Sequence, residues 1–205
     1  MSKDLLKRVT EDGVKFICLQ FTDVTGGVKS VDIPAAQLEN VINEGIFFDG
    51  SSIQGFARIQ ESDMMLVPDV NTYAVLPWSQ EERKRARIFC DVYTPSGDLF
   101  QGSPRGVLKT FLEKLEDRNW HFFVGSEPEF FLLKKNGPDR IHPVPYDVGG
   151  YFDFSASDDA QRVRAELMGA LTSMGLEIEM GHHEVALGQH EIDFQFADAL
   201  RTADN

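Results

Sequence analysis

The sequence is short of cysteine, of long apolar runs and of secretion signals. Cys18 and Cys90 are the two cysteines among 205 residues, too few for a disulfide framework. Both lie in apolar, strand-like segments, so we expect two buried, reduced thiols and a cytoplasmic location. No apolar run reaches the about 18 residues that a membrane span needs, and the first residues, MSKDLLKRVTEDG, resemble a charged helix. The sequence therefore predicts no membrane partner.

Basic residues are also scarce, with 20 Lys and Arg against 33 Asp and Glu and a net charge of −13. An acidic chain repels nucleic acid and anionic lipid, although acidity is more often a solubility feature. Neither a Walker-type phosphate loop nor a GxGxxG fingerprint occurs. Any nucleotide would therefore be held by metal and strands rather than by a glycine-rich loop.

The first half of the sequence predicts a small α+β domain. Residues 14–21 and 27–33 are typical of two strands, and the intervening TDVTG favours a hairpin turn. Pro34 then begins a short amphipathic helix that Gly45 ends. A long ordered loop, FFDGSSIQGFARIQESD, precedes three further strand candidates, MMLVPDV, TYAVLPW and RARIFCDVYT.

The segment TPSGDLFQGSPRG is rich in glycine, proline and serine and predicts a boundary between domains 1–102 and 103–205. A helix is expected over about 105–119, then one mostly buried strand in HFFVGSEPEFFLLKK. The stretch ASDDAQRVRAELMGALTSMG predicts a helix with Ser157 or Asp158 as its cap and Gly175 at its end. Two more strands follow in LEIEMGHHEVA and QHEIDFQF.

Two pairs of carboxylates stand out against their apolar surroundings. Glu127 and Glu129 are two residues apart, so on a strand they share one face. Pro128 between them lacks a backbone donor and favours an edge, a bulge or a strand end. Like charges side by side repel, so cations are the obvious compensation, and the alternative is an exposed face with solvated glutamates.

The second pair lies in GHHEVALGQHEIDF, residues 181–194. Glu184 and Glu191 are seven apart, but a tight turn at Leu187-Gly188 would fold the stretch into a hairpin. A two-residue loop there predicts that Glu184 and Glu191 lie directly opposite one another on one face. Oxygen-rich clusters suit Mg²⁺ or Mn²⁺. The histidines at 182, 183 and 190 could be ligands, but a hydrogen-bonded structural role is commoner for a single histidine.

With these motifs assembled, the sequence resembles class I glutamine synthetase, in a form similar to the α subgroup. The matching segments, in order, are FFDGSSIQGF, RIQESDMMLVPD, GSEPEFFLL, GGYFDF and GHHEVALGQHEIDF. The resemblance covers essentially the whole chain. It implies an N-terminal β-grasp domain followed by the first part of a catalytic domain, an antiparallel sheet with helices.

The resemblance implies a role for each matching carboxylate. Glu129, Glu184 and Glu191 would hold one Mg²⁺ or Mn²⁺, and Glu127 would contribute to a second. Glu129 and Glu184 would also border the bound substrate. Glu179 matches a position that contacts the nucleotide.

Two further positions match the family outside these strands. Asp49 in the FDGSS loop matches the catalytic carboxylate that binds ammonium and accepts its proton, although an Asp before Gly50 also suits a turn. Arg58 matches an arginine associated with feedback regulation by glutamine, and it could equally be a solvated charge. The short 134–150 loop lacks the insertion typical of the β subgroup.

The implied activity is that of a glutamate–ammonia ligase. ATP would phosphorylate the side-chain carboxylate of glutamate, and ammonia would displace phosphate from γ-glutamyl phosphate to give glutamine. The implied partners are ATP, glutamate, ammonium and further copies of the chain in a dodecamer of two hexameric rings.

The sequence departs from the family in two places. Leu187 stands where proline is common, which loosens the turn. The chain also stops at ADALRTADN, before the family's second half, so we expect a portion of such an enzyme with little activity alone. The alternatives are a non-catalytic metal-binding or subunit-interaction module and a relative that ligates another amine to glutamate.

Overall fold

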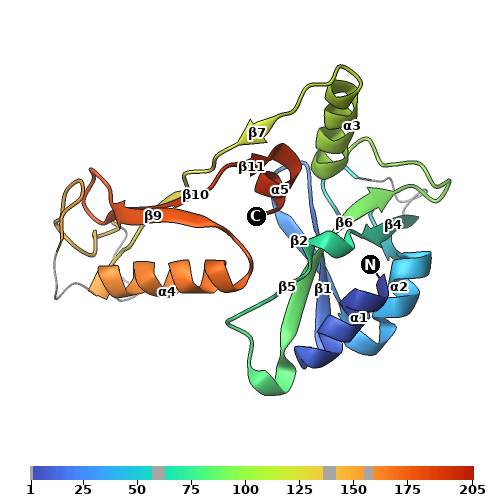
Figure 1. The fold of residues 1–205 in the computed structure, drawn as a ribbon, viewed down its shortest axis with the longest axis horizontal. Coiled ribbons are helices and arrows are strands. Elements are labelled where there is room, and N and C mark those ends of the chain that lie inside the picture. The colour runs from blue at the N-terminus through green and yellow to red at the C-terminus, as the bar shows by residue number, and fades with distance from the viewer. Residues whose placement is uncertain (1, 57–62, 136–141, 155–158) are drawn as a thin grey trace. The chain divides into compact units, whose positions relative to one another are not determined.

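The computed structural model describes residues 2–56, 63–135, 142–154 and 159–205 (Figure 1). Contacts divide the chain into two compact units, one of residues 1–122 with Asp204 and one of residues 123–203 with Asn205. Within the described ranges, no helix is both long and apolar enough to cross a membrane.

The first unit is built on a mixed sheet with the strand order β2-β1-β6-β4-β3, in which the short β5 also pairs with β6. Its central pair, β1 and β6, is parallel, and the remaining pairs are antiparallel. The strands are β1 Phe16–Thr22, β2 Val28–Pro34, β3 Ile46–Asp49, β4 Asp63–Pro68, β5 Ala74–Val75 and β6 Arg85–Tyr93. The short 3-10 turns are Ala35–Gln37, Val70–Thr72 and Glu81–Arg83.

The hairpin expected at the start of the chain is confirmed. β1 and β2 pair antiparallel up to Thr22 opposite Val28, and the Asp23 amide donates to the Gly27 carbonyl at 3.0 Å to close the turn. The helix expected after Pro34 is also present as α2 (Leu38–Glu44), and it ends at Gly45, whose φ of 72° is easily reached only by glycine.

The core of this unit lies between the sheet and its helices. β6 is buried along its interior, with Ile88 and Val92 fully covered. α1 (Ser2–Glu11) and α2 contribute Val9 and Leu38 to the same core. Cys18 and Cys90 are buried free thiols, as expected, and burial raises the pKa of Cys18 to about 11. Both therefore remain protonated and inert near neutral pH.

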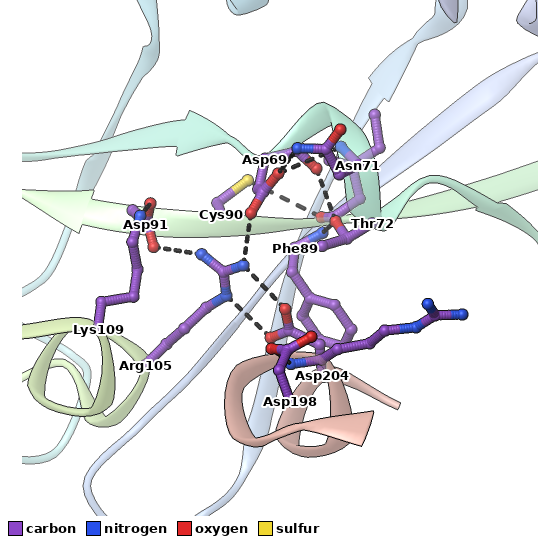
Figure 2. A network of polar contacts seen from close by, with 12 residues as sticks. Asp69, Asn71, Thr72, Phe89, Cys90, Asp91, Arg105, Lys109, Asp198 and Asp204 are labelled. Carbon is purple, nitrogen blue, oxygen red and sulfur yellow. Dashed lines mark hydrogen bonds and ion pairs between the residues drawn. The ribbon is translucent and has the colours of Figure 1, made fainter. Parts of the chain in front are cut away.

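A buried arginine joins several parts of the first unit, a feature that the sequence did not reveal. Arg105 stands in the first turn of α3 (Pro104–Glu116), where a cation is disfavoured by the helix dipole. Figure 2 shows its guanidinium pointing at Asp69, Asp91 and Asp204. The Asp204 contact is bidentate, with both N–O distances at 2.8 Å. Burial alone would lower the pKa of Arg105, but these carboxylates raise it, so the guanidinium stays charged.

The second unit contains a three-stranded antiparallel sheet of order β8-β10-β9 and a separate pair of short strands, β7 and β11. Their bounds, with those of the two helices, are β7 Phe123–Val124, β8 Glu129–Phe131, α4 Asp159–Ser173, β9 Ile178–His183, β10 Gln189–Phe194, β11 Ala197–Asp198 and α5 Ala199–Asp204.

The expectation of one buried strand over residues 121–135 is wrong. The segment contains two short strands, β7 and β8, and residues 125–128 belong to neither. The Ser126 and Pro128 carbonyls still accept from the Phe194 and Ile192 amides of β10 at 3.2 and 3.3 Å. Pro128, which has no backbone donor, stands just before β8. β8 lies at a sheet edge, and Phe131 and Leu133 are 54% and 48% exposed. An apolar run shows which residues favour burial, but not whether another element covers them.

Helix α4 covers one face of the β9–β10 hairpin (Figure 1). The two elements approach closely at Gly181, where an added Cβ would come within 2.8 Å of the Met168 sulfur. Gly175 follows the helix with a φ of 90°, as expected for its end. The expected caps, Ser157 and Asp158, lie outside the described residues.

Candidate metal centre on the β9–β10 hairpin

The hairpin forms in a different register from the expected one. The Leu187-Gly188 turn is present, because the Gln189 amide donates to the Ala186 carbonyl at 3.0 Å and Gly188 has a φ of 71°. The ladder, however, pairs His183 with His190 and His182 with Glu191. Glu184 therefore stands opposite Gln189 rather than Glu191, because its backbone amide donates a hydrogen bond to the Gln189 carbonyl at 2.8 Å.

In the observed register the carboxylates lie on the same face of the hairpin as expected from the sequence. The side-chain period of a strand is two, so a two-residue shift leaves every side chain on its original face. Glu184 and Glu191 become diagonal neighbours, with His182 beside both. One potential ligand atom from each of these three residues lies within 4.8 Å of the others. We call them the metal-binding group, after the role proposed for them below.

The metal-binding group is partly buried and rich in negative charge. His182 Nδ1 lies 3.8 Å from Glu184 Oε1, and His182 Nε2 lies 3.6 Å from Glu191 Oε2. Asp193 adds a further carboxylate, 3.7 Å from His182 Nε2. Burial, and then the neighbouring Glu184 and Asp193, raise the pKa of Glu191 to about 7. Within the described residues, Glu184 and Glu191 form no ion pair with lysine or arginine.

Glu129 and Glu127 lie near this group but outside it. Glu129 stands directly opposite Glu191 in the β8–β10 ladder, a pairing that the sequence did not predict. The Glu129 carboxylate accepts a hydrogen bond from the side-chain amide of Gln189. Glu127 is exposed in the segment before β8. Neither joins the three residues whose ligand atoms converge.

Glu179 is placed by a β-bulge. Met180 pairs with Asp193 and Ile178 with Phe194, which leaves Glu179 as the extra residue of β9. Its side chain is exposed and belongs to neither group of converging ligand atoms. Bulges often redirect a side chain next to a functional site.

A second polar group lies on the opposite face of the hairpin. Asp147, for which the sequence carried no signal, accepts from His183 Nε2 at 2.7 Å and lies 3.3 Å from His190 Nε2. The Arg164 guanidinium contacts His190 Nδ1 at 2.6 Å. Burial alone would lower the pKa of His183, but Asp147 and the Glu184 carbonyl raise it. Burial alone would raise the pKa of Asp147, but the hydrogen bond from His183 outweighs this effect and the pKa is lowered.

The two remaining candidates lie in the first part of the chain. Asp49 ends β3 and is exposed, and its carboxylate accepts from the Ser51 amide at 2.8 Å. This is the turn geometry that its position before Gly50 favours. Hydrogen bonds from the Ser51 hydroxyl and amide lower the pKa of Asp49, so it is ionised at neutral pH. Arg58 lies outside the described residues.

The donor set of the metal-binding group fits a divalent cation. Two carboxylates and one imidazole converge, and the raised pKa of Glu191 shows that their charge is not compensated within the described part of the chain. Carboxylate oxygens suit Mg²⁺ and Mn²⁺, and the imidazole makes Mn²⁺ the better match of the two.

Comparison with known proteins identifies two family domains in the chain. Residues 13–95 match the glutamine synthetase β-grasp domain, and residues 101–205 match the glutamine synthetase catalytic domain. Glutamine synthetases of Halobacterium salinarum and Methanosarcina mazei are 50% and 51% identical over 202 and 203 residues. These alignments cover 98% and 99% of this chain but 44% and 45% of the relatives. The chain thus spans about half the length of the curated relatives it matches.

Solved structures agree with this assignment. A GmaS/ADP complex in its first conformation superposes with a TM-score of 0.84 at 29% identity, covering 98% of this chain and 46% of that chain. Plasmodium falciparum glutamine synthetase, at 21% identity and a TM-score of 0.81, shows the same fold over the full chain and 46% of its own length. The α+β class, a β-grasp domain followed by the start of a catalytic domain, is therefore confirmed. The chain belongs to the glutamine synthetase family.

Proposed function

We propose that this chain supplies part of the active site of an ATP-dependent glutamate–ammonia ligase. The reaction is the formation of glutamine from glutamate and ammonium through γ-glutamyl phosphate. The observation that carries the proposal is the convergence of His182, Glu184 and Glu191, with Glu129 directly opposite Glu191. Membership of the glutamine synthetase family supports it.

The carboxylates of the hairpin and of β8 would hold the metals. Glu129, Glu184 and Glu191 would bind one Mg²⁺ or Mn²⁺, Glu127, just before β8, would contribute to another, and Glu129 and Glu184 would also border glutamate. When bound, such ions neutralise negative charge on the ATP phosphates. Hydrogen bonds within the chain orient two of these carboxylates. The Val185 backbone amide donates to the Glu184 carboxylate at 2.8 Å, and the Gln189 side-chain amide donates to the Glu129 carboxylate.

Asp49 and Glu179 would serve the other two substrates. The depressed pKa of Asp49 keeps a negative charge available to bind ammonium and to accept its proton. Glu179 contacts the nucleotide, and the similarity of this chain to a protein solved with ADP supports a nucleotide site.

Two further properties rest on the family resemblance alone, assembly into a dodecamer of two hexameric rings and feedback sensing through Arg58. The domain boundary between residues 102 and 103 rests on the composition of the segment TPSGDLFQGSPRG, and the cytoplasmic location rests on the two cysteines. Two buried free thiols are compatible with a reducing compartment.

A chimera tests this function, because the chain spans about half of its relatives. The 205 residues would replace the matching part of Thermus thermophilus glutamine synthetase, which is 48% identical over 206 residues and covered to 46%. We expect glutamine formation that requires ATP, glutamate and ammonium. Glu191→Gln and Asp49→Asn in the chimera should each abolish it, and Glu177→Gln, an exposed residue before β9, should not.

Three outcomes would contradict the proposal. A chimera that assembles correctly but forms no product would favour an interaction module instead. Product formation from another amine but not from ammonium would favour the ligation of that amine. Activity that survives Glu191→Gln would show that this carboxylate is not part of the metal site.

A further inference from the structure

The polar group behind the hairpin has a definite proton arrangement. Arginine can donate hydrogen bonds but cannot accept them. Since Arg164 lies 2.6 Å from His190 Nδ1, that nitrogen presents its lone pair and the ring proton is on Nε2. His190 Nε2 lies 3.3 Å from Asp147 Oδ2, within ion-pair distance but without hydrogen-bond geometry, so a proton on Nε2 is electrostatically favoured by the nearby carboxylate. One arginine on α4 thus fixes the tautomer of a fully buried histidine on β10.

Asp147 connects this histidine to the other strand and to the turn. Its Oδ1 accepts from His183 Nε2 at 2.7 Å and from the Gly188 amide at 3.1 Å. The Gly149 amide donates to the same oxygen at 3.3 Å. The carboxylate therefore contacts β9, β10 and the turn between them, which are the segments whose alignment defines the hairpin register.

The same ladder pairs set the metal-binding group. His183 pairs with His190 on one face, and the adjacent pair, His182 with Glu191, lies on the other. His183 Nδ1 also lies 2.6 Å from the Glu184 carbonyl, which fixes the backbone of that residue. Any slip of His183 against His190 would move Glu184 and Glu191 relative to each other.

Asp147, His183 and His190 could themselves be interpreted as a metal site, because their ligand atoms also converge within 4.8 Å. The arginine argues against this interpretation. A metal on His190 Nε2 would leave the ring without a proton on either nitrogen while Arg164 occupies Nδ1. Bound histidines usually donate their second N–H to an acceptor, which an arginine cannot be. Arg164 also places a positive charge in this group through its contact with His190, whereas the metal-binding group has no ion pair with lysine or arginine within the described residues.

We infer that Asp147 and Arg164 are positioning residues that act through His183 and His190 to hold Glu184 and Glu191 in the arrangement that binds a divalent cation. This inference rests on the proposed function, because it concerns the same metal site. It adds two residues that touch neither metal nor substrate, and it excludes a metal from the face on which they lie.

The first test reads the proton arrangement directly. Long-range ¹H–¹⁵N correlation spectra of the full chain should show His190 with its proton on Nε2 and none on Nδ1. A proton on Nδ1 in the wild-type chain would overturn the inference, whether or not metal binds.

The second test measures Mn²⁺ affinity by the EPR signal of free Mn²⁺. Asp147→Asn keeps an oxygen for His183 and for the two glycine amides, but sets an amide donor against His190 Nε2–H. Residues that orient metal ligands typically cost about 10- to 100-fold in affinity when changed, so we expect the Kd for Mn²⁺ to rise by about tenfold. Gly149→Ala, whose Cβ would lie 2.8 Å from His183 Nε2, should weaken binding without changing any charge, and it replaces Asp147→Asn if that variant does not fold.

The matched control is Met168→Ala, one turn along α4 from Arg164. Met168 packs on Gly181 of β9, so its truncation lowers the melting temperature without touching the polar group. We expect its Mn²⁺ Kd to stay within about twofold of wild type. Equal Kd values for folded Asp147→Asn and wild type, or an equal loss in Met168→Ala, would overturn the inference. So would a bound equivalent of Mn²⁺ or Zn²⁺ that Asp147→Asn loses and Glu191→Gln keeps. A wild-type chain that binds no Mn²⁺ would instead contradict the proposed metal site, and the tautomer measurement would still decide the inference.

Discussion

At the scale of single residues, Glu191 is the carboxylate of the proposed metal site whose surroundings most disfavour its charge. Its carboxylate is buried beside Glu184 and Asp193, and its pKa is raised from 4.5 to about 7. Groups with strongly shifted pKa values are frequent at binding and catalytic sites. A bound cation would favour the ionised carboxylate and reverse the shift.

This raised pKa predicts a pH dependence of stability without metal. Between about pH 4.5 and 7 the folded state holds a proton on Glu191 that the unfolded state has lost, so stability falls as pH rises through this window and levels off above it. Glu191→Gln removes this dependence. In EDTA at pH 8 the variant should be more stable than wild type by on the order of 1 kcal/mol, or about 2–4 °C in Tm.

Thermal melts at several pH values would check this prediction. Glu177→Gln is the control, because its exposed side chain lies before β9 and away from the group. A difference between wild type and Glu191→Gln that does not change from pH 5 to pH 8 would contradict it.

At the scale of elements, the β9–β10 turn depends on one glycine. Gly188 combines a φ of 71° with close packing, since an added Cβ would lie 2.8 Å from the Leu132 carbonyl oxygen. Gly188→Ala should therefore destabilise the chain through both strain and overlap, by about 2–4 kcal/mol. Denaturant unfolding followed by circular dichroism measures the loss.

Gly175→Ala separates the two causes. Gly175 has a φ of 90° after α4, but a Cβ added there would meet no other described residue within 4 Å. Gly175→Ala therefore introduces backbone strain without steric overlap, so its free energy of unfolding should fall by about 1 kcal/mol. Equal losses in the two variants would show that packing at Gly188 contributes nothing.

The Arg105 network makes a second prediction at this scale. Arg105→Gln would leave Asp69, Asp91 and Asp204 facing one another without their shared cation (Figure 2). Breaking a buried ion network typically costs about 3–5 kcal/mol. Arg162→Gln, which removes an exposed i,i+4 pair with Glu166 on α4, should cost less than about 0.5 kcal/mol. Similar unfolding free energies for the two variants would contradict this account.

The pattern of correct and incorrect expectations follows the range of the interactions involved. The β1–β2 hairpin and α2 were predictable because turn residues, capping and periodicity are local signals. The β9–β10 turn was also correct, yet a turn at Leu187-Gly188 is compatible with more than one register. The observed register places His183 against Asp147, which lies 36 residues away in the sequence, and no local pattern indicates such a contact.

The long-range polar contacts were not predicted from the sequence. Arg105 meets Asp204 across 99 residues, and its one local signal was a cation in the first turn of a helix, where it is unfavourable. The break between β7 and β8 was signalled by Pro128, but the apolar residues that follow it suggested burial. Among the site residues, the sequence placed Glu184 and Glu191 on one face of the hairpin, but its prediction that they lie directly opposite one another was wrong. It did not indicate that Glu129 would stand opposite Glu191.

At the scale of the whole molecule, the chain spans about half the length of the curated relatives it matches. It covers 44–46% of three curated relatives, and the structure provides one group of converging ligands suited to Mg²⁺ or Mn²⁺ within its described residues. We expect the 205-residue chain alone to show little or no turnover. A coupled ATP-hydrolysis assay with glutamate and ammonium checks this, with the full-length Thermus thermophilus relative as the control. Turnover comparable to that of the relative would contradict the prediction.

The central claim is that the hairpin binds a divalent cation through Glu184 and Glu191, and its most direct test is Mn²⁺ binding to the purified chain. EPR titration at pH 8 should show saturable Mn²⁺ binding that Mg²⁺ competes away. Glu191→Gln should raise the Kd by about tenfold or more, and Glu177→Gln should leave it within about twofold. Saturable binding that is the same in wild type and in Glu191→Gln would contradict the claim.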